Sequence, residues 1–209
     1  MAAHPDDEVL GMGGTIKKLS KQGHNLHLCT VTEGASAQYR DEKMIEIRKN
    51  ACIESGKFLG ISSFEFLDFK DMGLDSIPKL SITRNIEKII QKIDPEIIFT
   101  TPMNDLHPDH KLVCECTIAG SRPLKNNIEK LLSYEIPSPV VQQFNPNVFE
   151  NIKDEFEDKI KSFKIYESEV EEFPHPRSIR TIEALADFRG MQSGFKKAES
   201  FLLIQQFHR

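Results

Sequence analysis

Strand-like and helix-like segments alternate along the first 120 residues of this 209-residue chain. The helix-like segments place apolar residues mostly three and four positions apart, and they cover 8–22, 41–58, 80–93 and 109–119. Short apolar runs typical of buried strands lie between them, at 25–32, 64–69 and 96–100. Because parallel strands need helical crossovers, this order predicts an α/β, Rossmann-like fold: a doubly wound, mostly parallel sheet with helices on both faces.

The pattern is less regular after Pro102, because prolines recur at 123, 137, 139, 146, 174 and 176. In this half we expect four elements: a strand over 131–136, a helix over 153–166, a helix from about 177, and a closing strand or helix over 199–205. No internal repeat, low-complexity tract or linker is found, which favours a single domain over residues 1–209. The interrupted loops are where we expect ligand specificity.

Charge and composition exclude several classes of function. The chain has 27 Lys and Arg against 32 Asp and Glu, a net charge of −5, and no basic patch suited to nucleic acid. It has no apolar run of about 18 residues and no signal-peptide pattern. Four irregularly spaced cysteines are too few for a disulfide scaffold. We therefore expect a cytoplasmic protein without stable membrane insertion that acts on a small molecule; whether it forms a homo-oligomer stays open.

Two short motifs rich in histidine and aspartate stand just before predicted helices. They are His4-Pro5-Asp6-Asp7-Glu8 and His107-Pro108-Asp109-His110. Ligands of open parallel sheets bind at the carboxyl ends of the strands, so both motifs are expected on one rim. His4, Asp7 and one histidine of the second motif would form the two-histidine, one-carboxylate set of a catalytic zinc site. The alternative is that the carboxylates, Glu8 among them, only complement the helix starts and that the histidines are surface groups.

Three glycines after the first motif raise the alternative of a dinucleotide site. A G-x-G-x-x-G fingerprint that starts at Gly11 needs glycine at position 16, where the residue is Ile16. We therefore interpret Gly11, Gly13 and Gly14 as positions of close helix–sheet packing. There is also no G-x-S-x-G elbow and no cysteine in a nucleophile context, which disfavours covalent catalysis.

The motifs and their surroundings resemble those of a known family. Ala3 to Glu8, Gly13 to Thr15 and Asn104 to His110 are similar to the paired motifs of the PIG-L/LmbE-like zinc-dependent N-acetylglucosaminyl deacetylases. This family includes deacetylases of bacillithiol, mycothiol and glycosylphosphatidylinositol precursors. Further similarity at Tyr134 to Ser138 and at His175 to Ser178 favours the bacterial soluble branch with the bacillithiol-type enzymes.

The resemblance implies a role for each residue of the site. It implies that zinc, or another divalent metal, is bound by His4, Asp7 and His110. Asp6 would be the general base that deprotonates the metal-bound water. His107 would be the cation or acid that stabilises the oxyanion and assists the leaving amine, and Asp109 would orient His107 and raise its pKa. Arg48 would hold the sugar.

These roles predict a zinc-dependent hydrolase that removes acetate from an N-acetylated amino sugar. An amide is a poor electrophile, so a metal that polarises its carbonyl and a carboxylate that takes a proton from water suit this reaction. Two alternatives stay open: an amidase that acts on a sugar–thiol conjugate, and a non-catalytic domain that binds a sugar or nucleotide. The group attached to the sugar is not identified by the sequence.

One departure from the family concerns the start of the chain. Family members have a few apolar residues before the first motif, which form a central strand, and here only Met1 to Ala3 precede it. We therefore expect a truncated first strand, with either an open slot in the centre of the sheet or another segment in that slot. An open slot would leave several apolar side chains unburied, at a cost of about 1.5–3 kcal/mol each.

Overall fold

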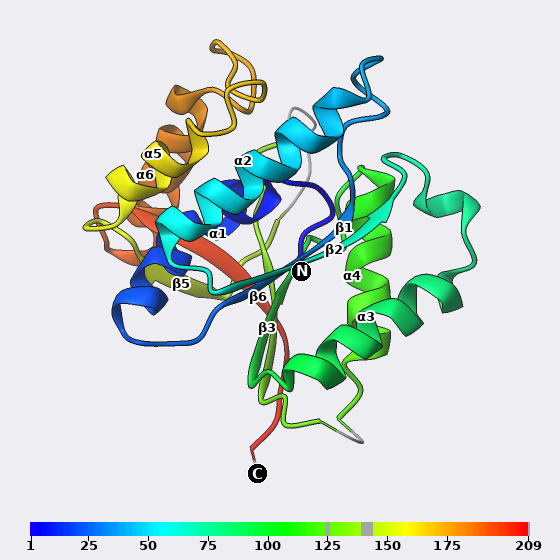
Figure 1. Cartoon of the computed structure of the whole chain (residues 1–209). Helices are drawn as coiled ribbons and strands as arrows, with labels where there is room; N and C mark the ends of the chain where they lie inside the picture. Colours follow the sequence, from blue (N-terminus) through cyan, green and yellow to red (C-terminus); the bar gives the residue numbers. More distant parts are fainter. Residues whose placement is uncertain (124–125, 139–143, 209) are drawn as a thin grey trace.

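Figure 1 shows the computed structural model of the chain, which describes residues 1–123, 126–138 and 144–208. Its helices are α1 (Asp7–Lys21), α2 (Lys43–Leu59), α3 (Lys79–Ile93), α4 (Pro108–Gly120), α5 (Phe156–Phe163) and α6 (Ile179–Ser193). Its strands are β1 (His27–Thr32), β2 (Ser63–Phe69), β3 (Ile97–Thr100), β4 (Lys130–Tyr134), β5 (Val148–Asn151) and β6 (Ala198–Gln206). A short 3-10 helix, Leu74–Ser76, precedes α3. The elements predicted over 8–119 occur within two residues of their expected bounds.

The strands form two sheets of different character. β1 and β2 pair in parallel, and the other sheet has the order β3-β4-β6-β5. In that sheet β3 and β4 are parallel, whereas β6 is antiparallel to both β4 and β5. The prediction of a mostly parallel sheet is therefore wrong in the second half of the chain, because the closing segment is a strand that runs against its neighbours. The four residues of β5 are too few to show a period, and the sequence does not predict them.

The first three residues lie between the two sheets. The backbone N–H of Ala2 donates to Cys29 O at 2.9 Å, and that of Val31 donates to Ala2 O at 3.0 Å. On the other side, the Met1 ammonium donates to Phe99 O in β3 at 2.8 Å. The expected central slot is thus filled by Met1 to Ala3 themselves, and Figure 1 shows this end of the chain in the middle of the molecule.

Helices cover both faces of the strands, as predicted. In Figure 1, α1, α2, α5 and α6 lie on one side, and α3 and α4 lie on the other. Neighbouring residues of β4 point to opposite faces, so Leu132 joins a core cluster with Val9 of α1, whereas Leu131 joins a second cluster with Val113 of α4. The two helices therefore pack on opposite faces of β4.

The glycines of α1 allow this helix to pack closely on the second sheet. A Cβ atom on Gly11 would lie 2.2 Å from the ring of Tyr134, and one on Gly14 would lie 2.8 Å from the side chain of Ile152. Real side chains do not approach this closely, so any larger residue would push α1 off the sheet. The interpretation as positions of close helix–sheet packing is confirmed for Gly11 and Gly14, whereas Gly13 packs against Lys159 of α5.

Candidate metal centre

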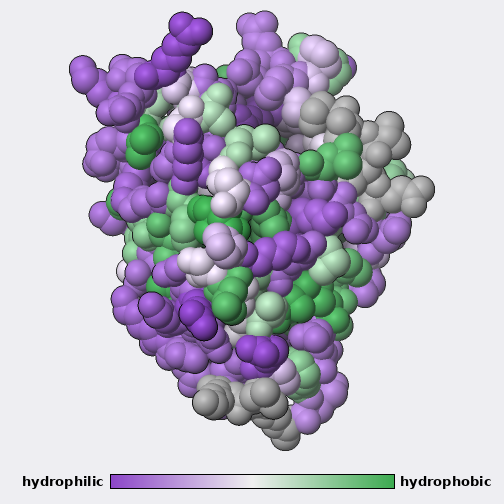
Figure 2. Space-filling model, turned by 90° about the vertical axis from the view of Figure 1, so that its right-hand side faces the viewer, coloured by the Kyte–Doolittle hydropathy of each residue, from purple (hydrophilic) through white to green (hydrophobic). Residues whose placement is uncertain are grey.

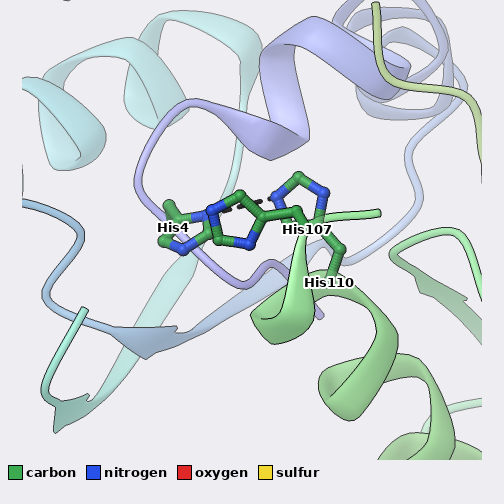
Figure 3. A group of neighbouring side chains, drawn as sticks. All are labelled: His4, His107 and His110. Carbon is green, nitrogen blue, oxygen red and sulfur yellow. Dashed lines mark hydrogen bonds between the residues drawn. The ribbon is translucent and has the colours of Figure 1, made fainter. Parts of the chain in front are cut away.

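The two predicted motifs meet at one edge of the molecule. His4 lies in the loop that leads into α1, Asp7 is the first residue of α1, and His110 lies in the first turn of α4. Figure 3 shows the imidazoles of His4, His107 and His110 turned toward one another. All the residues named here except His107 are buried, so the cluster lies below the surface.

Side-chain atoms of His4, His110 and Asp7 converge in this cluster. His4 Nδ1 lies 3.2 Å from His110 Nε2, and His110 Nε2 lies 3.3 Å from Asp7 Oδ1. The remaining pair, His4 Nδ1 and Asp7 Oδ2, is 3.5 Å apart. Tetrahedral zinc with bonds of about 2.0–2.1 Å sets neighbouring ligand atoms about 3.3–3.4 Å apart. The two imidazole nitrogens therefore have about the separation of neighbouring ligand atoms on a tetrahedral ion, and Asp7 presents a different carboxylate oxygen to each ring.

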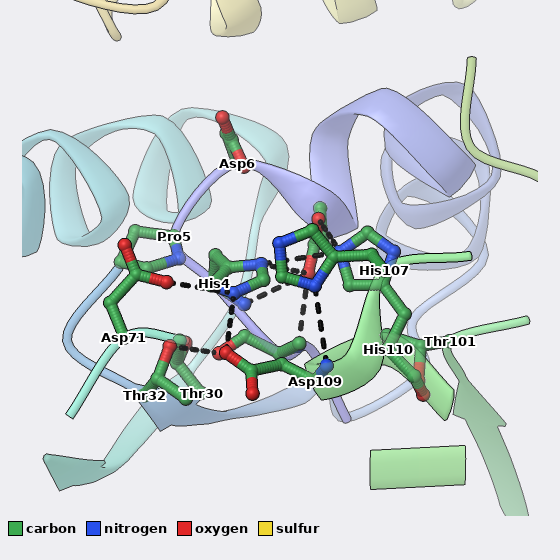
Figure 4. A network of polar contacts seen from close by, with 12 residues as sticks. His4, Pro5, Asp6, Thr30, Thr32, Asp71, Thr101, His107, Asp109 and His110 are labelled. Carbon is green, nitrogen blue, oxygen red and sulfur yellow. Dashed lines mark hydrogen bonds and ion pairs between the residues drawn. The ribbon is translucent and has the colours of Figure 1, made fainter. Parts of the chain in front are cut away.

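Carboxylates orient both imidazoles from behind. Asp105 Oδ2 lies 2.7 Å from His110 Nδ1. On the other ring, His4 Nε2 lies 3.2 Å from both Asp71 Oδ1 and Asp109 Oδ2. Metal-binding histidines commonly donate their second ring N–H to a carboxylate, which fixes the tautomer and the ring plane. Figure 4 shows these contacts around His4 and leaves Nδ1 of His4 and Nε2 of His110 directed to the shared centre.

The backbone holds the third donor. Asp7 Oδ2 accepts hydrogen bonds from the N–H groups of Ala3 at 3.0 Å and His4 at 2.8 Å. This turn is closed by Pro5 and by the start of α1, so the carboxylate is fixed relative to the ring of His4. The donor set is therefore assembled by local structure as well as by tertiary contacts.

The surrounding carboxylates create a strongly negative potential. Burial alone would lower the pKa values of His4 and His110, but Asp109, Asp7 and Asp71 hold the pKa of His4 well above its usual range. Asp7 and Asp105 likewise raise the pKa of His110 to about 9 against the effect of burial. Such a site stabilises positive charge, either as protons on the rings or as a bound cation.

His107 has a different environment from the one predicted. Its ring stacks on His110 at a centroid distance of 4.5 Å, and its Nδ1 accepts a 3.3 Å hydrogen bond from the backbone N–H of Asp109. The Asp109 carboxylate instead accepts from Met72 N at 2.8 Å and faces His4. Burial and the neighbouring histidines lower the pKa of His107 to about 4. The predicted contact between the Asp109 carboxylate and the His107 ring is therefore not found, because His107 caps α4 and the carboxylate turns toward His4. The charge of Asp109 does raise the pKa of His107, as predicted, but burial and the two neighbouring histidines lower it further.

Asp6 belongs to a separate cluster of charges. Its φ of 113° lies in the left-handed region, which turns its fully buried side chain away from that of Asp7. Its Oδ2 lies 3.2 Å from Arg48 Nη2 and 3.5 Å from Arg177 Nε. Its Oδ1 has no hydrogen-bond partner among the described residues, and no contact drawn in Figure 4 reaches it.

Arg48 is buried behind Asp6. Its Nη2 donates to Pro5 O at 2.7 Å, and its Nε lies 3.4 Å from Glu169 Oε1. Only 2% of its side chain is exposed. These contacts let Arg48 hold the loop that carries Asp6, and the predicted contact of Arg48 with a sugar stays a prediction.

Four residues of this site have no role assigned from the sequence: Asp71, Asp105, Glu169 and Arg177. Asp71 follows the end of β2, and Asp105 lies two residues before the second motif, so the strand-end rule that locates the histidines also applies to both. Glu169 and Arg177 lie in the irregular segment between α5 and α6. Arg177 lies in the segment His175 to Ser178 that resembles the family, whereas no local pattern marks Glu169; the approach of both to Asp6 depends on how those helices pack.

Figure 2 shows the face formed around α3 and α4. Polar and charged side chains cover most of it, and hydrophobic ones gather near its middle. Within the described ranges, no helix is both long and apolar enough to cross a membrane.

Comparison with known proteins gives the family. Residues 1–120 match the family described as PIG-L, GlcNAc-PI de-N-acetylase. The chain is 26% identical over 220 residues to the diacetylchitobiose deacetylase of Thermococcus kodakarensis, and the alignment covers 96% of this chain and 80% of that protein. It is 28% identical over 178 residues to the probable N-acetyl-alpha-D-glucosaminyl L-malate deacetylase 2 of Bacillus cereus, and this alignment covers 80% of this chain and 81% of that protein. The crystal structure of N,N'-diacetylchitobiose deacetylase from Pyrococcus horikoshii superposes with a TM-score of 0.80 at 24% identity, over 97% of this chain and 81% of that one. The chain therefore belongs to the PIG-L family of deacetylases.

Proposed function

We propose that this protein is a metal-dependent deacetylase that removes acetate from an N-acetylglucosaminide. The observation that carries the proposal is the pair of imidazole nitrogens of His4 and His110, which lie 3.2 Å apart and 3.3–3.5 Å from the two carboxylate oxygens of Asp7 in a buried centre. The relatives support the reaction class, because both matched proteins are named as deacetylases of N-acetylated sugars.

The proposed metal is zinc, held by His4, Asp7 and His110. Two histidines and one carboxylate form a donor set typical of catalytic zinc sites, which keep a further position for a ligand. When bound, zinc would polarise the amide carbonyl and lower the pKa of a coordinated water. Another divalent metal is the alternative, and metal analysis of the purified protein distinguishes the two.

Asp6 is the proposed proton acceptor. Burial raises its pKa, and the guanidiniums of Arg177 and Arg48 only partly oppose this effect. Its Oδ1 is buried and lacks a hydrogen-bond partner in the described part of the chain, which is unusual for a carboxylate in a folded protein. The water molecule that attacks the amide would donate a hydrogen bond to Asp6 Oδ1 and then transfer its proton to it.

His107 is proposed to act as a neutral hydrogen-bond donor. Because its Nδ1 accepts from the N–H of Asp109, the ring proton resides on Nε2. With a pKa of about 4, the ring is uncharged near neutral pH. A neutral N–H group that points to the reacting carbonyl would stabilise the developing oxyanion, as in other acyl-transfer sites. This role replaces the imidazolium that the sequence predicts.

Metal content and acetate release test the proposal together. The protein should bind about one equivalent of zinc and should release acetate from N-acetylglucosaminides, whereas Asp7→Asn should lose both properties. Asp154→Asn, which alters a side chain that is 82% exposed, is the matched control and should keep both. A protein that binds less than about 0.2 equivalents of zinc would favour a binding domain without catalysis. Zinc binding with release of a larger acyl group but no acetate would favour the amidase.

A further inference from the structure

Helix α1 is interrupted shortly after it leaves the metal centre. Met12 has φ −150° and ψ 25°, outside the helical region, so α1 consists of a short first segment, 7–11, and a longer second segment, 13–21. The first segment begins with Asp7, and its few residues cannot hold a helix by their own hydrogen bonds. The position of Asp7 therefore depends on the contacts that hold this segment.

A buried ion pair lies at the interruption. Lys159 Nζ, from α5, lies 2.6 Å from Glu199 Oε1, from β6, and the two side chains are only 5% and 3% exposed. In an uninterrupted helix the N–H of Gly14 would donate to Leu10 O. Here Leu10 O accepts from Lys159 Nζ at 2.8 Å. The carboxylate of Glu199 accepts from the N–H groups of Gly14 at 3.0 Å and Thr15 at 2.7 Å. The pair thus supplies partners to backbone groups on both sides of the interruption.

The two charges match the dipoles of the two helix segments. The carbonyl end of the first segment meets the ammonium of Lys159, and the N–H end of the second segment meets the carboxylate of Glu199. Cations are favoured at the C-terminus of a helix and anions at its N-terminus. Hydrogen bonds to charged groups are also stronger than those between neutral groups. The pair is therefore suited to fix one segment relative to the other.

Stability alone is a weak reason for burying such a pair. Taking two charges out of water costs free energy, and apolar residues of similar volume often replace a buried ion pair without loss of stability. What Lys159 provides beyond packing is direction, because its ammonium meets one particular atom, Leu10 O, three residues after Asp7. A directed contact at this point holds the orientation of the first turn of α1.

From these contacts we infer that Lys159 and Glu199 are positioning residues for the metal centre. Lys159 holds Leu10 O, and the N–H of Leu10 donates to Asp6 O at 2.9 Å, so the ammonium is linked to the turn that carries Asp7. The inference rests on the proposed function, in which Asp7 binds the metal. It gives a role in the site to two residues that lie outside the family match over 1–120.

Lys159→Met tests the inference, because it keeps the hydrocarbon chain and removes the ammonium. Its zinc Kd, measured by competition with a chelator, should rise about 10- to 100-fold, the usual effect of losing a group that supports a metal ligand. The visible spectrum of the cobalt(II)-loaded protein should also change, since it reports the arrangement of ligands around the ion. A lower Tm with native zinc Kd and native cobalt spectrum would overturn the inference and leave the pair a purely structural role.

Ile86→Ala is the matched control for loss of stability. Ile86 is fully buried in α3 and lies beside Gly120, at the opposite end of α4 from His110. Removing its side chain should lower the Tm, because it leaves a cavity in the second core cluster. The zinc Kd and the cobalt spectrum should stay native. A rise in zinc Kd equal to that of Lys159→Met would show that any loss of stability weakens the metal centre, and would overturn the inference.

The double variant Lys159→Met, Glu199→Gln separates positioning from charge burial. It leaves no unpaired charge, so its Tm should exceed that of Lys159→Met. Leu10 O still lacks the ammonium, so the zinc Kd should stay raised. Recovery of the native zinc Kd together with the Tm would overturn the inference. The double variant also carries the test if Lys159→Met does not fold.

The proposed function and this inference fail in different ways. If the native protein binds neither zinc nor another divalent metal, the deacetylase proposal fails. Hydrogen exchange of the metal-free protein then decides whether the pair holds the turn of Asp7. In Lys159→Met the amides of Val9 and Leu10 should exchange at least about 10-fold faster, with a much smaller change in α3. Equal acceleration in α3 and in the first segment of α1 would overturn the inference.

Discussion

Asp6 and Asp7 are neighbours in the sequence, yet they lie in opposite electrostatic surroundings. Asp7 faces the imidazoles of His4 and His110, whereas Asp6 faces the guanidiniums of Arg48 and Arg177. The left-handed backbone at Asp6 separates the two side chains. Asp7 thus belongs to the histidine cluster proposed to bind a cation, and Asp6 belongs to a cluster of buried arginine and carboxylate charges.

The pKa directions follow this division. Burial raises the pKa of Asp6, and the arginines do not fully reverse that effect. Burial acts on Asp7 in the same sense, but His110 and His4 overcome it and hold the pKa of Asp7 well below its usual range. A carboxylate that stays ionised suits a metal ligand, and one with a raised pKa suits a proton acceptor. Neighbouring residues, and not the residue type, divide the two roles.

The largest effects on metal content and activity should come from replacing Asp7 or Asp6 singly with asparagine. Asp7→Asn should empty the metal centre, because a tetrahedral site loses one of its three protein donors. Asp6→Asn should keep the metal and lower kcat by about 10²–10⁴, the usual contribution of a general base. Elemental analysis and acetate release measure the two quantities separately. Metal loss in Asp6→Asn together with full occupancy in Asp7→Asn would reverse the assignment.

A smaller effect should come from the arginine cluster, and it is measured here on stability. Arg48→Met removes a buried cation that faces Asp6 and Glu169, and it should lower the free energy of unfolding by about 3–5 kcal/mol in urea. Arg177→Met should cost less, because 28% of that side chain is exposed. The double variant Arg48→Met, Glu169→Gln should lose less free energy of unfolding than the sum of the two single variants, since it leaves no unpaired charge at Glu169. A loss below about 1 kcal/mol in Arg48→Met would show that this cluster does not stabilise the fold.

The approach of His4 and Asp7 to the histidines of the second motif could be predicted because it depends on a topological rule, whereas the choice of His110 came from the resemblance to the family. Each motif follows a strand edge of an α/β sheet, and short loops leave such residues little freedom. The hydrogen-bond partners of those residues could not be predicted in the same way. Asp109 and His107 are close in the sequence, yet capping of α4 by the His107 ring turns the Asp109 carboxylate toward His4. Sequence spacing locates a residue on the rim but does not decide which atom it faces.

The second half of the chain shows a different limit. Its prolines predict irregular loops, and the structure places the Glu169–Arg177 and Lys159–Glu199 pairs in this half. These residues reach the site through the packing of α5 and α6 and through the antiparallel return of β6. Such long-range pairings leave no periodic pattern, which is also why the mixed sheet is missed.

Glu8, the third carboxylate of the first motif, gives the smallest expected effect. The sequence offers a helix-start charge as its role, but the structure buries it and gives its Oε1 a hydrogen bond from the Tyr166 hydroxyl. Burial raises the pKa of Glu8 to about 7. The folded protein therefore keeps a proton on Glu8 that the unfolded chain releases near pH 4.5.

This difference makes stability depend on pH. Between about pH 4.5 and pH 7 the folded state binds more protons at Glu8 than the unfolded state does, so the free energy of unfolding should fall as the pH rises, by up to about 3 kcal/mol. Above about pH 7 both states are ionised and this contribution becomes constant. Glu8→Gln keeps an acceptor for Tyr166 and removes the ionisation, so its stability relative to the native protein should increase over this range. Urea unfolding of both metal-free proteins at pH 5, 6, 7 and 8 measures the difference, in which the titration of the histidines cancels. Parallel stability curves would show that Glu8 is ionised in the folded protein at pH 5 and that Tyr166 holds it as a carboxylate.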